Sequence, residues 1–241
     1  MSPHLLRTVQ AIFLLLLLSG TLELVGAEPV SPLDMQVKSS STRTISGLTN
    51  VSAQGGNVTE LRIDMLSVTK TWQGYFGNIT GNIHLDDADN NSFYVWGNAS
   101  SVNGEIYASR NSSPGWSSIN CTNSTQVDLE NAYLGVSSGD GDSVTNTFSA
   151  TAHPAFNVGL RPITNDSCLS TNIYVNGTAQ GDAFYQILLS DDADSVIYTT
   201  IIEDDQYGYN SRLMDFQLMV GENEHDGNSG PTLYYFFVEL S

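Results

Sequence analysis

Hydrophobic and polar residues alternate over short stretches along most of the chain, a pattern typical of β-strands. One segment, residues 125–135, instead indicates a helix, with Ser124 or Thr125 as its cap and Gly135 as its end. We therefore predict an all-β fold, a β-sandwich of the immunoglobulin-like or jelly-roll-like kind with one short helix. The predicted strands cover residues 60–69, 74–85, 92–97, 104–109, 145–151, 155–160, 172–177, 184–190, 195–202, 215–220 and 232–240.

The amino-terminal residues have the pattern of an export signal. The apolar run AIFLLLLLSG at 11–20 follows a segment that contains Arg7 and no acid. Its apolar part is about a dozen residues long, whereas a membrane-spanning helix needs roughly twenty. Small residues at 25–27 place the expected cleavage before Glu28. We predict a signal peptide over 1–27, an extended polar leader over 28–54, and a β-sandwich over 55–241, built as one unit or as two packed halves. No later stretch predicts a transmembrane span in the mature chain.

The charge of the chain excludes nucleic acid as a partner. Acidic residues outnumber basic ones by 26 to 8, which gives a net charge of −18, and no basic cluster is present to neutralise phosphates. Charged residues of both signs nevertheless make up only 14% of the chain. The negative charge therefore reflects a shortage of lysine and arginine, and the polar surface is built from serine, threonine, asparagine and glycine.

The two cysteines, Cys121 and Cys168, are what a single disulfide requires in an exported chain. A zinc site is the poorer alternative, because neither cysteine has a second cysteine or a histidine at ligand spacing. Ten N-x-S/T motifs support the same compartment as candidates for glycosylation; the alternative is that these residues simply gather in turns. The motifs begin at Asn50, Asn57, Asn78, Asn90, Asn98, Asn111, Asn120, Asn123, Asn165 and Asn176.

The string DDAD occurs twice, at 86–89 and at 191–194, each time between two predicted strands. Asp87, Asp89 and Asn91 have the D-x-D-x-N spacing of the first half of a calcium-binding loop, which makes them candidate metal ligands. The second half of that motif is absent, with Ser92 at its sixth position and Asn98 at its twelfth. Solvated turns are the simpler interpretation, because aspartate and asparagine tolerate turn geometry. An internal duplication is a further alternative. We expect no cofactor other than calcium.

No catalytic residue is predicted, and we expect the chain not to be an enzyme. Ser137 lies in GVSSG, which matches the G-x-S-x-G motif of hydrolases, but a strand is predicted after it where that motif needs a helix. His84, His153 and His225 share no motif with a base or a nucleophile. Aromatic residues are dense in the first half of the chain and could stack on sugar rings, although a place in the core is the commoner fate. They are Trp72, Tyr75, Phe76, Tyr94, Trp96, Tyr107 and Trp116.

The motif W-x-G-Y-F-G-N at 72–78, together with GEIYASRNSSPGWSSINC, FYQILLSDDADSVIYTTIIEDD and DFQLMVGEN before TLYYFFVEL, resembles an uncharacterised family. This family consists of predicted secreted or cell-surface proteins found mainly in archaea. The resemblance covers roughly residues 55–240 and includes both cysteines. It implies an extracellular, cell-surface location and a role beside surface layers or filaments, and it brings no catalytic residues.

Two classes of function follow from these observations. The first is a structural or adhesive protein of the cell envelope that binds other surface proteins or copies of itself. Strand exchange is one version, in which the leader 30–45 or the terminal segment 232–240 completes a sheet in the next molecule. In the simpler alternative, 232–240 is a central strand of its own domain. The second class is a secreted carbohydrate-binding module or carbohydrate-active enzyme.

Overall fold

The structure is a computed structural model that describes residues 28–44, 52–63, 66–96, 103–175, 178–179, 182–223 and 230–241. The predicted signal peptide lies outside these residues. Strands predominate in the described chain, and its two α-helices are short, which confirms the predicted all-β class. The helices are α2 (Ser124–Tyr133) and α3 (Val144–Thr147), with a 3₁₀ turn η1 at Trp116–Ser118.

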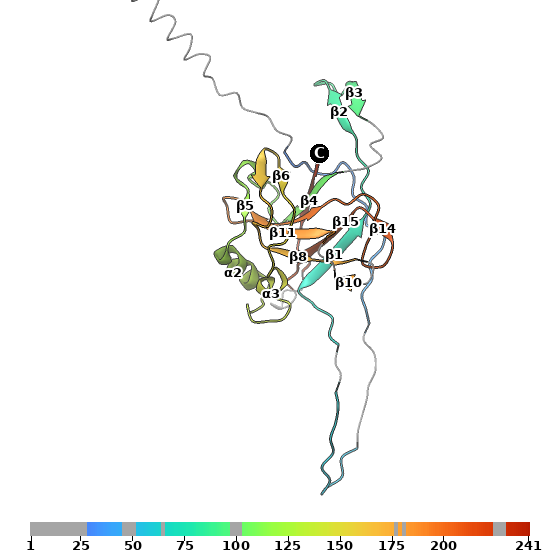
Figure 1. Cartoon of the computed structure of the whole chain (residues 1–241), viewed down its shortest axis with the longest axis vertical. Coiled ribbons are helices and arrows are strands. Elements are labelled where there is room, and N and C mark those ends of the chain that lie inside the picture. The colour runs from blue at the N-terminus through green and yellow to red at the C-terminus, as the bar shows by residue number, and fades with distance from the viewer. Residues whose placement is uncertain are drawn as a thin grey trace, which may run out of the picture.

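A six-stranded antiparallel sheet forms the centre of the molecule (Figure 1). Its strand order is β16-β4-β12-β11-β5, and β8 also pairs with β11. Strands from distant parts of the described chain are neighbours in this sheet, since β4 lies between β12 and the terminal strand β16. The strands are β4 (Gly104–Ser109), β5 (Asn120–Cys121), β8 (Ser170–Asn172), β11 (Tyr185–Ser190), β12 (Val196–Ile201) and β16 (Tyr235–Leu240).

Five smaller two-stranded ribbons complete the described fold, and two of them supply core residues on the two faces of the central sheet. These two are β1 (Trp72–Gly77) with β15 (Phe216–Gly221) on one face and β6 (Phe156–Val158) with β7 (Arg161–Ile163) on the other. The remaining ribbons pair β2 (Ile83–Asp86) with β3 (Ser92–Trp96), β9 (Tyr174–Val175) with β10 (Thr178–Ala179), and β13 (Gln206–Tyr207) with β14 (Leu213–Met214).

Two hydrophobic clusters occupy the two faces of the central sheet. Along β4, Ile106 and Ala108 point into the first cluster, which includes residues of β15 and the helices. Tyr107 points into the second, which includes residues of β6, β7 and η1. Successive side chains of a strand point to opposite faces, so a strand buried on both faces is apolar at nearly every position. The predicted sandwich is therefore realised as one large sheet with a smaller layer on each face.

The N-cap of helix α2 is Asn123, one residue before the first of the two predicted caps. The Asn123 side chain accepts a hydrogen bond from the Gln126 amide at 3.2 Å, and the Gln126 side chain accepts one from the Asn123 amide at 2.9 Å. This reciprocal pair is a capping box, which satisfies two amides that the helix leaves without partners. At the other end, Gly135 adopts a positive φ of 68°, as the sequence predicted for the residue that stops the helix.

Two predicted strands are wrong, and a third, 74–85, is divided between β1 and β2, with residues 78–82 in neither strand. The described residues of 60–69 form no strand and are exposed, because alternation makes a strand only where another strand offers hydrogen bonds. The segment 145–151 begins inside helix α3 instead. The Ser143 hydroxyl accepts from the Asn146 amide, and the Val144 amide donates to the Asn131 side chain at 2.8 Å, so α2 fixes the start of α3. The prediction overlooked this capping serine.

The terminal strand β16 belongs to its own domain, as the simpler expectation held, but it lies at the end of the sheet order and not in its centre. Over Tyr235–Leu240 its inner edge pairs with β4. On its outer side the described chain contributes one isolated antiparallel bridge, between Val238 and Val30 of the leader. The leader thus touches the sheet at a single point before it leaves the body of the molecule (Figure 1).

Candidate functional site

The loop proposed as a metal site is a hydrogen-bonded hairpin turn between β2 and β3. One carboxylate oxygen of Asp87 accepts hydrogen bonds from the Asp89 amide at 2.9 Å and from the Asn91 amide at 2.8 Å. The Asn91 side chain also donates to the Asp87 carboxylate, at 2.9 and 3.1 Å. These bonds lower the pKa of Asp87, the largest contribution coming from the Asn91 side chain. The side chains of Asp87 and Asn91 therefore satisfy each other and brace the turn, whereas Asp89 takes part through its amide.

The second acidic loop, between β11 and β12, has the same hydrogen bonds. Asp191 accepts from the Ala193 amide at 3.0 Å and from the Ser195 amide at 2.8 Å. The residue three positions after the bracing aspartate has a positive φ in both loops, 63° at Asn90 and 59° at Asp194. Asp87 is the second residue of its DDAD string and Asp191 is the first, so the strings are offset by one position when the turns are superposed. The repeat thus reflects a shared turn geometry.

The surroundings of the two turns differ. Asp191 is only 4% exposed, and its second oxygen accepts from the Asn111 side chain at 3.2 Å and from the Gly115 amide at 3.3 Å. It therefore ties the loop after β4 to the β11–β12 hairpin, whereas Asp87 bonds only to its own turn. Among the residues that the structure describes, no group of three or more histidine, cysteine, aspartate or glutamate side chains could hold a metal ion. Calcium binding stays an expectation.

The predicted disulfide is confirmed. Cys121 on β5 and Cys168, just before β8, are bonded, with their Cα atoms 4.8 Å apart. Cys168 is fully buried in the cluster that β6 and β7 cover. The bond therefore closes a long loop, removing conformational freedom from the unfolded chain, and pins the edge of the central sheet to its second core.

The N-x-S/T motifs differ in how accessible their asparagines are. Asn111 is half-buried, and its side-chain nitrogen donates to the Asp191 carboxylate and to the Ser195 hydroxyl, which commits the atom that would carry a glycan. Three of the candidates, Asn50, Asn98 and Asn176, lie outside the described residues. The side-chain nitrogens of Asn120 and Asn165 also donate hydrogen bonds, to the Ser118 carbonyl and the Asp166 carboxylate, but these two residues are exposed. The remaining candidates are exposed as well: Asn57, Asn78, Asn90 and Asn123.

The residues considered for catalysis do not assemble into a site. His153 is buried, and its Nε2 atom accepts from the amides of Ser167 and Cys168 at 3.1 and 2.9 Å. Its Nδ1 atom therefore carries the proton and donates to the Pro154 carbonyl at 2.8 Å, which makes the ring a structural clamp. Ser137 lies in the turn between the helices, without the strand that the hydrolase motif needs before its serine. His225 lies outside the described residues.

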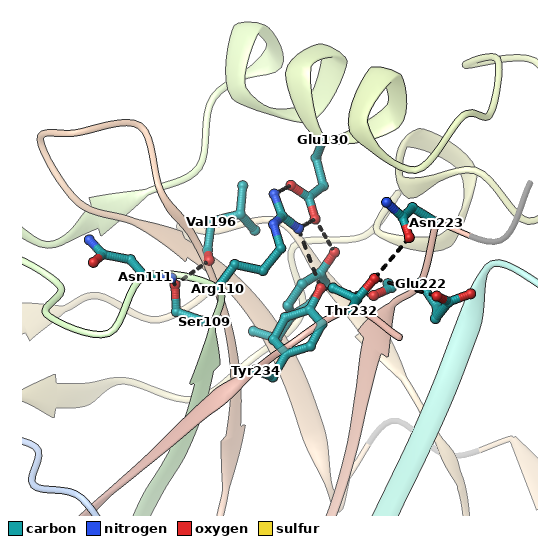
Figure 2. Close-up of polar contacts among 11 residues, drawn as sticks. Ser109, Arg110, Asn111, Glu130, Val196, Glu222, Asn223, Thr232 and Tyr234 are labelled. Atoms are coloured by element: carbon teal, nitrogen blue, oxygen red, sulfur yellow. Dashed lines mark hydrogen bonds and ion pairs between the residues drawn. The ribbon is translucent and has the colours of Figure 1, made fainter. Parts of the chain in front are cut away.

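A buried ion pair joins helix α2 to the central sheet (Figure 2). The two terminal nitrogens of Arg110 donate to the two carboxylate oxygens of Glu130 at 2.5 and 2.6 Å. The Tyr198 hydroxyl donates to the same carboxylate at 2.7 Å, and the guanidinium lies 3.7 Å from the centre of the Tyr133 ring. Burial alone would lower the pKa of Arg110, but its bonds to Glu130 raise it overall. This arginine is neutralised by its partner and offers no anion site.

A pair of buried carboxyl groups lies at one end of the second face. Glu105 on β4 and Glu239 on β16 are register partners, and they are 7% and 9% exposed. Glu239 accepts from the Tyr107 hydroxyl at 3.2 Å and from the Gly159 amide, in the β6–β7 turn, at 2.9 Å. Burial, and then the charge of Glu239, raises the pKa of Glu105 to about 8. Burial also raises the pKa of Glu239, against the hydrogen bonds from Gly159 and Tyr107. Glu105 is therefore mostly protonated near neutral pH, which avoids a second buried charge beside Glu239.

Paired carboxyl groups also cleave glycosidic bonds, but they do so beside an open cleft that admits a sugar ring. Here both side chains are more than nine-tenths buried, and the β6–β7 turn packs over Glu239. Sequence reasoning missed this pair and the ion pair of Arg110. A signal existed, since GEIYAS and FFVEL each place one acid inside a strand that is otherwise apolar or small.

The β2–β3 hairpin projects from the body of the molecule (Figure 1). Every residue of its two strands is exposed, including Phe93 at 83% and Trp96 at 52%. Tyr94 and Trp96 lie edge to face on one side of it, with ring centroids 4.9 Å apart. By contrast, Tyr107 and Trp116 pack against each other in the second core. Tyr75 and Phe76 are exposed on β1, where they pack against Phe236 and Tyr209, and Trp72 is half-buried. The aromatic residues proposed for sugar stacking are therefore spread over the second core, strand β1 and this hairpin.

No known protein family, curated protein or solved structure matches this chain. The likeness to archaeal surface proteins that the motif at 72–78 indicates therefore stays an expectation. Within the described ranges, no helix has both the length and the apolarity that a membrane span requires.

Proposed function

We propose that this chain is an exported structural or adhesive protein of the cell surface that acts by binding and not by catalysis. The observation that carries the proposal is the β2–β3 hairpin, which holds Leu85, Phe93 and Trp96 in solvent away from the core. An isolated two-stranded hairpin is marginally stable in water, and a group of large apolar side chains without a covering layer marks a contact surface. The partner is a neighbouring copy or another surface protein.

Two further features support an extracellular role. The disulfide fits an oxidising compartment, where such bonds persist. The exposed asparagines of the N-x-S/T motifs lie where glycans would extend into solvent without disturbing the core. The signal peptide expected over 1–27 would place the chain in that compartment.

Carbohydrate binding by the same hairpin is the second candidate function. Tyr94 and Trp96 expose neighbouring rings on β3, and exposed aromatic faces can stack on sugars. The rings would then be the binding platform, and loss of either ring would abolish binding to the sugar without changing the fold.

The experiment compares the chain with a double variant, Phe93→Ser with Trp96→Ser, on coated beads. We expect beads that carry the unmodified chain to cluster and beads that carry the variant to stay dispersed. Leu129→Ser is the matched control, because Leu129 is a similarly exposed apolar residue on α2 and its loss should leave clustering unchanged. Binding of the chain to a glycan array, lost in the variant, would instead support the second candidate. Absence of clustering would refute binding between copies through the hairpin, and absence of glycan binding would refute the second candidate.

A further inference from the structure

The outer edge of β16, at Val238, could pair with a whole strand but pairs with one residue of the described chain. We call this edge the seat. The Val30 amide donates to the Val238 carbonyl at 3.0 Å, and the Val238 amide donates to the Val30 carbonyl at 2.8 Å. No other residue of the described chain pairs with this edge. A sheet edge left open is a template on which a further strand can add.

Two prolines explain why the leader makes a bridge here and not a strand. Alternate residues of a strand face the same neighbour, so Val30 and Pro32 both face β16. Pro32 has no amide hydrogen and cannot donate to the next position of the ladder. Pro29, on the other side, is buried and anchors the contact. The arm formed by residues 28–30 is therefore short, specific and held by few interactions.

The tether behind the arm leaves it free to reach another molecule. Residues 31–71 connect Val30 to β1, and all described residues from 33 to 70 are exposed. They form a long excursion away from the body (Figure 1). A linker of this length sets the effective concentration of the arm near its own seat at roughly 1 mM. Copies packed at comparable density on a surface would compete for that seat on equal terms.

We propose that the arm exchanges between copies, so that Val30 of one molecule pairs with Val238 of the next. The occupant of the seat is the arm of a second copy. The arm already pairs with this edge within its own chain, and every copy carries both the arm and the edge. Exchange of an identical element costs little, since every interaction that one molecule gives up is formed again in its neighbour. This inference deepens the proposed function and rests on it, because the exchanged arm adds a second link between copies that the β2–β3 hairpin has already brought together.

Disulfide trapping tests the exchange directly. Two residues that bond through both amides and both carbonyls have Cα atoms about 5.5 Å apart, a distance that a disulfide can span. The native cysteines are already joined to each other and do not compete. The single variants Val30→Cys and Val238→Cys are mixed in equal amounts at total concentrations from about 10 μM to 1 mM, around the effective concentration of the tether, and oxidised gently.

We expect a disulfide-linked dimer that contains one chain of each variant and that increases at least tenfold over this concentration range. In the control mixture, Val37→Cys replaces Val30→Cys. Val37 lies in the same leader, is exposed and does not pair with β16. The dimer yield of this mixture therefore measures disulfides formed by random collision. The double variant with both cysteines in one chain checks the seat, because it should close within a single molecule at low concentration.

The exchange is refuted if the double variant closes within one chain but the mixed variants give no more dimer than the control at the highest concentration. It is also refuted if the double variant does not close, because the seat itself is then wrong. Neither result affects bead clustering through the β2–β3 hairpin, so failure of the exchange and failure of the proposed function are distinguishable.

Discussion

Replacing Glu105 with glutamine should remove most of the dependence of stability on pH between pH 5 and 8. Glu105 is 7% exposed and faces Glu239, whose carboxylate accepts from Tyr107 and from the β6–β7 turn. In the unfolded chain the pKa of Glu105 returns to its ordinary value of 4.5, whereas burial and the facing charge raise it to about 8 in the folded protein. The folded state thus binds one more proton than the unfolded state across this window.

The sign and size of the effect follow from proton linkage. Where the folded state binds more protons, the free energy of unfolding falls as pH rises, by about 1.36 kcal/mol per pH unit for one group. From pH 4.5 to 8 the wild-type protein should therefore lose about 5 kcal/mol because of Glu105. Below pH 4.5 the group is protonated in both states and contributes no slope. Glutamine is neutral at every pH. As pH rises, the free energy of unfolding of the variant should therefore fall only by the amount that Glu239 and other buried acids contribute.

The assay is urea unfolding followed by tryptophan fluorescence, at pH 5, 6, 7 and 8, with the disulfide intact. We expect Glu105→Gln to be more stable than the wild type at pH 8 and close to it at pH 5. Asp128→Asn on α2 removes an exposed carboxylate and serves as the control, with an unchanged slope. The reasoning is refuted if Glu105→Gln keeps the wild-type slope, because Glu105 is then charged in the folded protein at neutral pH.

Three further predictions test the packing of the described chain. Arg110→Met should cost about 3–5 kcal/mol in urea unfolding, because it leaves the Glu130 carboxylate buried without its cation, and adding Glu130→Gln should restore part of the loss; a cost below about 1 kcal/mol would contradict this. Gly104→Ala should reduce the yield of folded protein sharply, because Gly104 has a φ of 137° and a Cβ atom there would overlap a carbonyl oxygen of β16; a normal yield would show that the edge strand can move. Asp191→Ala should cost about 2 kcal/mol and Asp87→Ala less than about 0.5 kcal/mol, measured by thermal unfolding, because the donors to Asp191 are partly buried and those to Asp87 are exposed; equal costs would contradict that distinction.

Several features of the fold were determined by the sequence locally. The strands β4 and β11 begin and end within one residue of their predicted bounds, because both faces of these strands are buried and polar turn residues follow each of them. The helix over 125–135 and its end at Gly135 were predictable from capping residues a few positions apart. The disulfide followed from the cysteine count alone. Each of these signals lies within one segment or concerns a pair without competitors.

The order of the strands and the candidate site were decided by tertiary structure. The sequence places Glu105 and Glu239 more than a hundred positions apart, and only the pairing of β4 with β16 brings them face to face and shifts a pKa. The alternation at 60–69 predicted a strand that the described chain does not form, since no other described segment offers it an edge. Conversely, the outer edge of β16 is available for pairing, but the described chain contributes only the bridge from Val30 to it. A local pattern specifies which face of a strand prefers burial, but pairing depends on distant segments, and only the folded chain determines which edges stay open.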